Sequence, residues 1–198
     1  PHDTVCVQDV SGSMARRDCE CSRLDASQQA SETYIRRRAV LSPDDRIAVV
    51  TFNHRARVVL ALTGMGQMDR IVSALAALRV GGGTDIAEGL KAANDVFAQD
   101  AEVTGHPTPA RCRRILLLTD GHGGRPLSWA EYLKRAGVLV EVIGVGGEPS
   151  AVDEPLLRRV ATTDADGFVH YWFFRDTEGL VAHYEALASG LIYRGRRG

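Results

Sequence analysis

The stretch VQDVSGSM, residues 7–14, is the most informative part of the sequence for the fold, because a hydrophobic run ends there on a carboxylate. Asp9 is followed by Ser11 and Ser13, with Gly12 between the two serines. A strand that ends on Asp9 and then turns sharply presents three oxygen-bearing side chains around one point, and glycine permits such a turn because it lacks a Cβ atom. Three hard oxygen donors suit Mg²⁺ or Mn²⁺ better than Zn²⁺, which prefers nitrogen and sulfur. The two serines are equally compatible with capping of the next helix.

Two later segments favour the metal interpretation. GGGTD, residues 81–85, opens a helical pattern and carries Thr84, and RILLLTDG, residues 114–121, is a second hydrophobic strand that ends on Asp120. The whole pattern resembles the metal-ion-dependent adhesion site of the von Willebrand factor type A domain, and it extends over nearly the whole chain. The resemblance implies one divalent-cation site formed by five residues, which are Asp9, Ser11, Ser13, Thr84 and Asp120.

The resemblance also implies a role for each of the five. Ser11 and Ser13 are expected to bind the ion through their hydroxyl groups, and Thr84 to bind it directly or through water. Asp9 and Asp120 are expected to act mostly through water or as hydrogen-bond acceptors. The neighbouring Asp85 is expected to brace the loop rather than to touch the metal.

Neutral hydroxyl ligands leave a cation electron-poor, so it attracts a carboxylate from elsewhere. The resemblance therefore implies a protein–protein interaction module, with Mg²⁺ or Mn²⁺ bound and Ca²⁺ as an alternative. The partner is expected to supply a Glu or Asp to the ion. Secreted members of the family act in adhesion, whereas short intracellular bacterial members act with ATPases or other effectors, and we expect the second setting here.

Composition limits the other classes of function. The chain has 198 residues, 44% of them hydrophobic and 25% charged, with a formal net charge of −1. We expect a single domain over 1–198 with a polar inserted loop over 15–23 and a basic tail over 194–198. The charge argues against binding to nucleic acid or to an anionic membrane. No hydrophobic run approaches the length of a bilayer-spanning helix.

The four cysteines are too few for a disulfide scaffold of this size. We therefore expect reduced thiols and a cytoplasmic location, or a secreted one if a leader has been trimmed from the sequence. Cys19 and Cys21 are expected to be reduced loop thiols. A zinc pair shared with another chain and a redox pair are the alternatives left open for them.

Hydrophobic periodicity predicts alternating strands and helices. This alternation favours an α/β fold: a Rossmann-like, doubly wound, mostly parallel six-stranded sheet with one antiparallel edge strand and helices on both faces. Ligands of such sheets bind beyond the carboxyl ends of the strands where the order reverses. We predict strands over 4–9, 46–52, 56–62, 115–119, 139–145 and 168–174, and helices over 24–41, 68–78, 86–97, 127–136, 155–162 and 177–189, with a loop over 100–112.

Enzyme chemistry is the competing interpretation. Aspartyl-phosphate phosphatases need a second acidic residue two positions after the nucleophile, where this chain has Ser11 after Asp9. Neither serine lies in a Gly-x-Ser-x-Gly turn, and no phosphate-binding Gly-x-x-x-x-Gly-Lys loop is present. His122 is either an exposed loop residue or a contact to the partner's carboxylate. We expect no enzyme activity; a metal-assisted hydrolase or phosphatase that uses the same ion is the alternative.

Overall fold

A computed structural model describes residues 1–104 and 111–191 of the chain. In this part the strands form one six-stranded sheet in the order β3-β2-β1-β4-β5-β6. Only β2 and β3 pair antiparallel, so the predicted mostly parallel sheet with one antiparallel edge strand is confirmed. The strands are β1 (His2–Asp9), β2 (Arg46–Phe52), β3 (Ala56–Gly64), β4 (Cys112–Thr119), β5 (Leu139–Val145) and β6 (Tyr171–Phe174).

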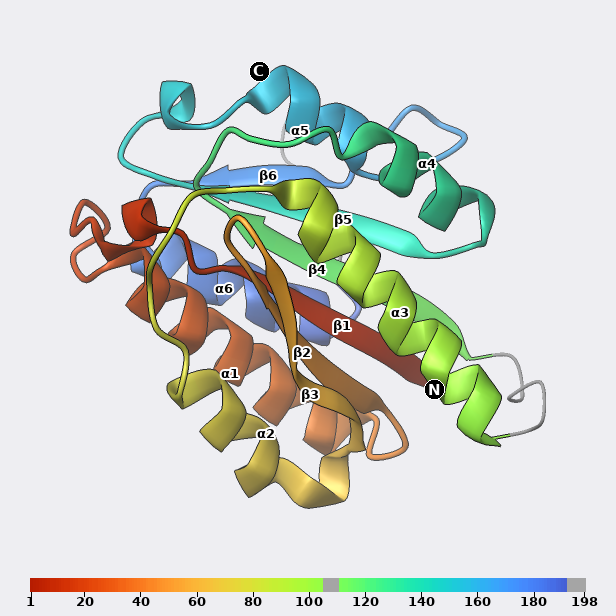
Figure 1. Cartoon of the computed structure of the whole chain (residues 1–198). Coiled ribbons are helices and arrows are strands. Elements are labelled where there is room, and N and C mark those ends of the chain that lie inside the picture. Colours follow the sequence, from red (N-terminus) through yellow and green to blue (C-terminus); the bar gives the residue numbers. More distant parts are fainter. Residues whose placement is uncertain (105–110, 192–198) are drawn as a thin grey trace.

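Helices cover both faces of the sheet (Figure 1). One face is covered by α1, α2 and α6, and the other by α3, α4 and α5. The helices are α1 (Arg23–Leu41), α2 (Met68–Ala76), α3 (Ile86–Thr104), α4 (Leu127–Arg135), α5 (Glu154–Val160) and α6 (Thr177–Ala188), with short 3₁₀ turns η1 (Gly12–Ala15), η2 (Met65–Gln67) and η3 (Pro149–Ala151).

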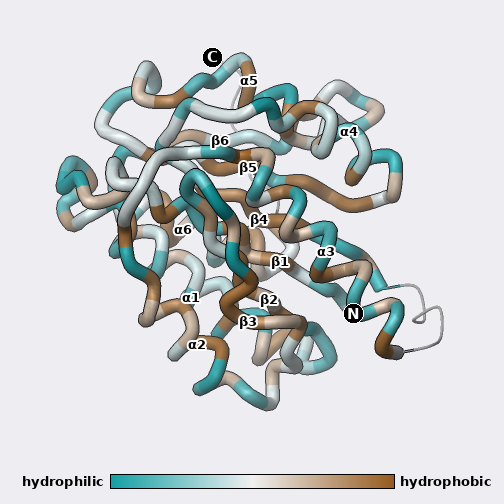
Figure 2. The backbone as a smooth tube through the Cα atoms, in the orientation of Figure 1, coloured by the Kyte–Doolittle hydropathy of each residue, from teal (hydrophilic) through white to brown (hydrophobic). Residues whose placement is uncertain are grey.

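The two hydrophobic cores explain why the strands read as nearly continuous hydrophobic runs. Successive residues of β1 enter opposite cores, Val5 and Val7 on the α3 side and Cys6 on the α1 side. A parallel strand buried on both faces has few solvent-facing positions left for polar residues. Figure 2 shows hydrophobic colour along the central strands and hydrophilic colour at the tip of the β2–β3 hairpin.

The order of the strands reverses between β1 and β4, because the chain proceeds from β1 toward β3 and then returns to β4. The parallel pairing of these two strands brings their carboxyl ends to the same edge of the sheet. Asp9 is the last residue of β1, and Asp120 directly follows β4. The edge predicted to carry the ligand is therefore the edge where these two carboxylates meet.

Several elements differ in length from the prediction; β4, for example, begins at Cys112 rather than at 115. Contacts in the structure account for the differences in α3 and β6. The helix predicted over 86–97 continues as α3 into the predicted loop over 100–112. Helix-forming residues continue there, and Asp100 pairs with Arg46 of β2 at 2.8 Å, which holds the added turns against the sheet. The last strand starts at Tyr171 rather than at 168, because His170 donates from its backbone N–H to the Thr162 carbonyl instead of to a neighbouring strand. The predicted basic tail over 194–198 lies outside the described residues.

Candidate metal site

Asp9 fixes the turn that follows β1. Its Oδ1 accepts a hydrogen bond from the backbone N–H of Ser11 at 2.8 Å, and its Oδ2 accepts one from Thr119 Oγ1 at 2.6 Å. The side chain is fully buried, and burial raises the pKa of the Asp9 carboxyl, although the hydrogen bonds from Ser11 and Thr119 oppose that shift. Both carboxylate oxygens of Asp9 are thus already engaged by the protein.

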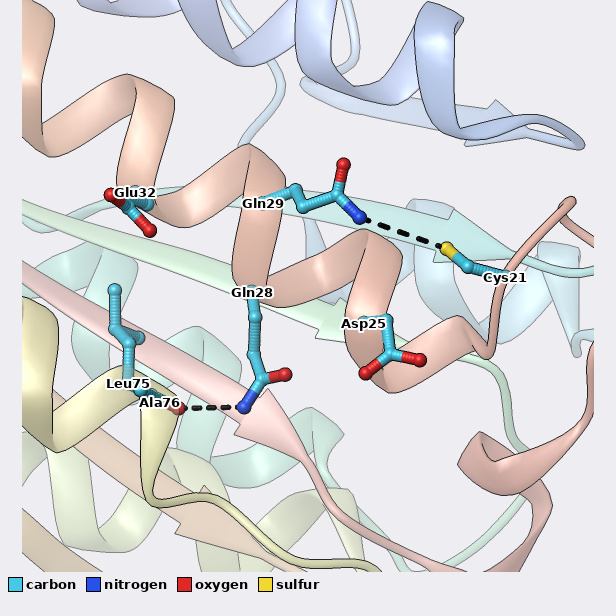
Figure 3. A pocket seen from close by; sticks show the side chains of 7 residues that line it. All are labelled: Cys21, Asp25, Gln28, Gln29, Glu32, Leu75 and Ala76. Carbon is cyan, nitrogen blue, oxygen red and sulfur yellow. Dashed lines mark hydrogen bonds between the residues drawn. The ribbon is translucent and has the colours of Figure 1, made fainter.

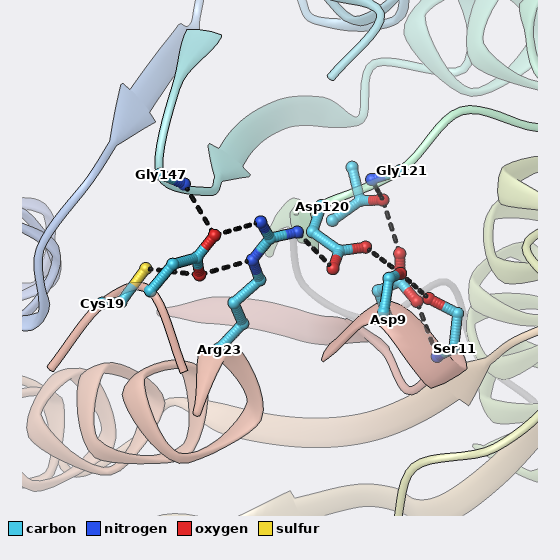
Figure 4. Close-up of polar contacts among 10 residues, drawn as sticks. Asp9, Ser11, Cys19, Arg23, Asp120, Gly121 and Gly147 are labelled. Carbon is cyan, nitrogen blue, oxygen red and sulfur yellow. Dashed lines mark hydrogen bonds and ion pairs between the residues drawn. The ribbon is translucent and has the colours of Figure 1, made fainter. Parts of the chain in front are cut away.

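The two serines lie against Asp120. Ser11 Oγ is 3.1 Å from Ser13 Oγ, and Ser13 Oγ donates to Asp120 Oδ1 at 2.8 Å. Because Ser13 donates its only proton to the carboxylate, Ser11 is the donor in the contact between the two hydroxyls, and one lone pair of Ser13 Oγ remains for a cation. Residues that are far apart in sequence therefore form one oxygen cluster across the β1 and β4 ends, which Figure 4 shows from close by.

Thr84 reaches the same place from the glycine loop before α3. This loop is held against the turn after β1, since the N–H of Gly12 donates to the Gly82 carbonyl at 3.0 Å. The space around Gly121 shows how close Thr84 lies to Asp9. A Cβ atom at position 121 would lie 3.3 Å from Thr84 Oγ1 and 3.6 Å from Asp9 Oδ2. All five residues predicted as metal ligands are therefore on one edge of the sheet, around the β1 and β4 ends.

Asp85 acts on the backbone rather than on the oxygen cluster. Its Oδ1 accepts from the N–H of Ala87 at 3.0 Å, in the first turn of α3. The same carboxylate lies against Gly124, whose φ is +75° and where an added Cβ would come within 2.0 Å of Asp85 Oδ1. Only glycine fits there, so Asp85 and Gly124 together fix the distance between the glycine loop and the β4–α4 loop.

Arg23 is a contact of the site that sequence reasoning missed. Its Nη1 donates to Asp120 Oδ2 at 2.8 Å, and its Nε donates to Asp18 Oδ1 at 2.8 Å, with a second short contact from Nη2 to Asp18 (Figure 4). Asp18 also accepts from the N–H of Gly147 at 3.1 Å. We call Asp18, Arg23 and Asp120 the Arg23 bridge. The hydrogen bond from Arg23 lowers the pKa of Asp18 well below its usual value.

One signal in the sequence points to an ion pair at Arg23, although not to its partners. Arg23 is the first residue of α1, where the helix macrodipole disfavours a cation. Its side chain is only 2% exposed, and a buried arginine needs carboxylate partners. An arginine at a helix start next to a metal motif therefore indicates an ion pair, but the sequence does not single out Asp18, since Glu20 and Asp25 are closer to Arg23 along the chain.

The donor set fits a hard divalent cation. Among residues 1–104 and 111–191, no group of three or more His, Cys, Asp or Glu side chains is placed to hold a metal. Any ion at this edge must therefore be held by hydroxyl oxygens together with carboxylates, which suits Mg²⁺ or Mn²⁺. His122, the histidine next to Asp120, has an exposed side chain.

The four cysteines are all free thiols. Cys19 and Cys21 form an isolated backbone bridge on either side of Glu20, which has a φ of +71°. Cys21 Sγ lies 3.3 Å from Thr177 Oγ1 at the start of α6. Burial raises the pKa of Cys19 to about 11. Within the described residues these thiols have no His, Asp or Glu set around them that would complete a zinc site.

Cys21 also borders a hollow of about 370 Å³ between α1 and α2 (Figure 3). The two carboxylates on its wall are already used: Asp25 forms the capping box of α1 with Ser22, and Glu32 pairs with Arg36 at 2.7 Å. Neither carboxylate is therefore left over to bind a ligand in this hollow.

The sheet is doubly wound, and its oxygen cluster lies at the carboxyl ends of the strands, at the point where the strand order reverses. This arrangement is typical of α/β domains that bind a ligand at that edge. Residues 4–122, more than half of the chain, match the family model of the von Willebrand factor type A domain, and the chain belongs to this family.

Similar proteins include calcium-activated chloride channel regulator 1 from Bos taurus, 29% identical over 188 residues that cover 93% of this chain. The chain spans only about a fifth of the length of the curated relatives it matches, 19% in that case. The vWF domain of the type V pili tip protein Mfa5 from Porphyromonas gingivalis has a TM-score of 0.79 at 16% identity, covering 100% of this chain and 98% of that one.

A third similar structure is proximal thread matrix protein 1 from the mussel byssus, described with a zinc-occupied MIDAS motif. Its TM-score is 0.75 at 19% identity, over 94% of this chain and 47% of that one. At these identities the likeness to solved structures shows the fold alone. No helix among the described residues has the length and hydrophobicity needed to cross a membrane.

Proposed function

We propose that this domain binds one divalent cation at the β1–β4 edge and docks an acidic residue of a protein partner on that ion. The proposal rests on one observation above others: Ser11, Ser13 and Asp120 already form a continuous chain of oxygen atoms at 3.1 and 2.8 Å. Domains of this family are typically interaction modules rather than enzymes, and some of them hold a metal at this motif.

The proposed ligands are the five residues at this edge. Ser11, Ser13 and Thr84 supply hydroxyl oxygens, while Asp9 and Asp120 orient them and balance the charge of the ion. Mg²⁺ and Mn²⁺ suit these oxygens better than Zn²⁺, the ion named for the mussel protein. A bound ion with few anionic ligands would attract a carboxylate from the partner.

Charge around the site supports an acidic partner. The loops at this edge carry exposed arginines that form no ion pair with any described residue, among them Arg16, Arg17, Arg55 and Arg125. Two exposed carboxylates lie among them: Glu20 is in the same loop as Arg16 and Arg17, and Glu148 is in the loop after β5. A partner segment rich in Glu or Asp would therefore meet the arginines when one of its carboxylates reaches the ion.

Metal-assisted hydrolysis receives no support from the contacts of the two serines. A serine nucleophile needs a general base within hydrogen-bond reach. In the described part of the chain, no histidine hydrogen-bonds to Ser11 or Ser13, and Ser13 donates to Asp120 instead. The cytoplasmic setting and a role beside an ATPase or another effector stay predictions from the sequence.

Calorimetry with Mg²⁺ and with Mn²⁺ tests the ion site. We expect one ion per chain for the wild type and for Ser128→Ala, an exposed serine of α4, but no measurable binding for Ser13→Ala. Equal binding by all three proteins would refute the site.

A pair of synthetic peptides tests the docking step. A peptide with a run of Glu residues should bind the Mg²⁺-loaded domain and be released by EDTA, whereas its Gln counterpart should not bind. Thr84→Ala and Arg125→Glu should weaken binding of the Glu peptide. Arg70→Glu should not, because Arg70 is an exposed residue of α2, away from this edge, that forms no ion pair with any described residue. Binding that survives both EDTA and Thr84→Ala would place the interface elsewhere.

A further inference from the structure

We infer that Arg23 determines the cation selectivity of this edge: by holding one oxygen of Asp120, it makes the site favour Mg²⁺ and Mn²⁺ over Ca²⁺. The inference rests on the proposed ion site and goes beyond it, since Arg23 is not one of the five proposed ligands. It follows from which oxygen atoms the protein leaves available.

The first step is a count of carboxylate oxygens. Both oxygens of Asp9 accept hydrogen bonds, from the Ser11 N–H at 2.8 Å and from Thr119 Oγ1 at 2.6 Å. Asp120 Oδ2 accepts from Arg23 at 2.8 Å. Asp120 Oδ1 instead accepts from the hydroxyl of Ser13, which is itself proposed to bind the ion, so this oxygen lies directly beside the proposed ion position.

The second step is that Arg23 cannot move aside easily. It is 2% exposed, and the other edge of its guanidinium is held by both oxygens of Asp18. The β5–α5 loop closes over this pair, because a Cβ at Gly147 would lie 3.1 Å from Asp18 Oδ2 and one at Gly146 3.4 Å from Arg23 Nη2. Charge-assisted contacts on both sides keep the guanidinium directed at Asp120.

The third step is the coordination chemistry of the ions. Ca²⁺ takes 6–8 oxygen ligands and commonly binds a carboxylate through both of its oxygens, whereas Mg²⁺ takes six ligands and retains several waters. Asp120 Oδ2 is held by Arg23, and both oxygens of Asp9 accept hydrogen bonds, so an ion bound through both oxygens of either aspartate would have to share an oxygen with a hydrogen bond of the protein. Three hydroxyl groups, single carboxylate oxygens and water match the requirements of Mg²⁺ and Mn²⁺.

The experiment compares dissociation constants for Mg²⁺, Mn²⁺ and Ca²⁺, measured by calorimetry on the same protein preparations. The wild type should bind Mg²⁺ and Mn²⁺ more tightly than Ca²⁺. In Arg23→Met, Asp120 Oδ2 is released, and the ratio of Ca²⁺ to Mg²⁺ affinity should rise by at least about tenfold. In Arg23→Lys, which retains the charge without the rigid fork, the ratio should rise by less.

Arg46→Met is the matched control. Arg46 also joins two aspartates, Asp3 and Asp100, but it does so at the amino end of β1, away from the proposed ligands. Its removal should leave the ratio of Ca²⁺ to Mg²⁺ affinity within twofold of the wild-type value. Near-ultraviolet circular dichroism identifies the variants that remain folded, and Arg23→Lys serves if Arg23→Met does not fold.

The outcomes separate the two proposals. A wild type that binds none of the three ions refutes the proposed ion site itself. A wild type that binds Ca²⁺ more tightly than Mg²⁺ refutes the inference about Arg23 and leaves the ion site standing. The inference is also overturned if the ratio is unchanged in both Arg23 variants, or if it shifts equally in Arg46→Met.

Discussion

Two arginines of this chain each join two aspartates, at opposite ends of β1. Arg46 donates two hydrogen bonds to Asp3 and two to Asp100, at 2.7–2.9 Å, so it uses all four oxygens of its partners. Arg23 grips both oxygens of Asp18 but touches Asp120 through Oδ2 alone. We call Asp3, Arg46 and Asp100 the Arg46 bridge.

The difference between the two bridges shows how one kind of ion pair can serve two purposes. The Arg46 bridge is partly exposed, with Arg46 at 21%, and Asp3 has a second arginine partner in Arg111 at 2.7 Å. Such a saturated pair fastens the amino end of the sheet to α3. The Arg23 bridge is almost wholly buried at the arginine, yet it leaves Asp120 Oδ1 to the Ser13 hydroxyl.

The largest expected effect is the loss of folding stability when each bridge loses its arginine. Arg23→Met leaves the buried Asp120 carboxylate without its cation and should cost about 3–5 kcal/mol. Arg46→Met should cost less, roughly 1–2 kcal/mol, because its groups are partly hydrated and Asp3 keeps Arg111. Urea unfolding without added metal measures both values. Equal losses would mean that burial does not distinguish the two bridges.

As the pH is lowered, the protein should lose stability at a higher pH than the one at which either bridge is broken. Burial lowers the pKa of His183 to about 4 in the folded state. In the unfolded chain this histidine is protonated below its ordinary pKa of about 6.5. Stability should therefore fall as the pH drops from 6.5 to 4, by roughly 3 kcal/mol in all. The pKa values of Asp3 and Asp18 are lowered, so their stabilising contributions persist above pH 4 and are lost only below it.

His183→Phe isolates this effect from that of His170, which is also buried. His170 has a raised pKa, because Glu141 and Asp164 favour its charged form against the cost of burial. Its contribution is fully present below pH 6.5 and is lost as the pH rises through the raised value. In His183→Phe the free energy of unfolding, measured with urea, should therefore fall much less between pH 6.5 and pH 4 than in the wild type. A decline that persists would assign the acid sensitivity to other groups.

Cation binding should stabilise the folded wild type, and this gain should depend on residues at the edge of the Arg23 bridge but not on the Arg46 bridge. At a Mg²⁺ concentration one hundred times the dissociation constant, the gain should be about 2.7 kcal/mol. Thermal unfolding should show this gain for the wild type and for Asp3→Asn, a change in the Arg46 bridge. It should show no gain for Ser13→Ala, and a gain in that variant would move the ion away from Ser13.

The smallest effect expected is in thiol labelling. Burial raises the pKa values of Cys6 and Cys19 to about 12 and about 11, so both should react slowly with iodoacetamide at pH 8, while the exposed Cys112 reacts fast. Arg23→Met frees Asp18, whose loop carries Cys19, and should speed Cys19 labelling several-fold. Arg46→Met should not. Mass spectrometry of tryptic peptides reports each rate, and fast labelling of Cys19 in the wild type would contradict its buried placement.

Most of the fold could be predicted from the sequence, because buried parallel strands and amphipathic helices leave strong periodic patterns. β2 and β5 have the predicted limits, 46–52 and 139–145. The predicted end of α3 was wrong because a long-range ion pair, Asp100 with Arg46, holds a longer helix against the sheet. The predicted β6 was too long because hydrophobicity does not show which backbone groups pair between strands.

The candidate site was predictable in part. The motif located five residues that the structure places at one edge, while their role as ligands stays a prediction. Arg23 and Asp18 were missed because their pairing depends on how the 16–22 loop folds back onto the β4 and β5 ends. Side-chain contacts made through a loop leave no periodic signal in the sequence.

The Arg23 bridge sets a rule for protein engineering. A designer who transfers the five proposed ligands onto another scaffold copies Asp120 without the guanidinium that holds its Oδ2. A faithful graft therefore has seven residues, because Arg23 needs Asp18 to keep it in place. The loop between η1 and α1 can then be redesigned in length and sequence only as long as it returns one carboxylate to the first residue of the helix.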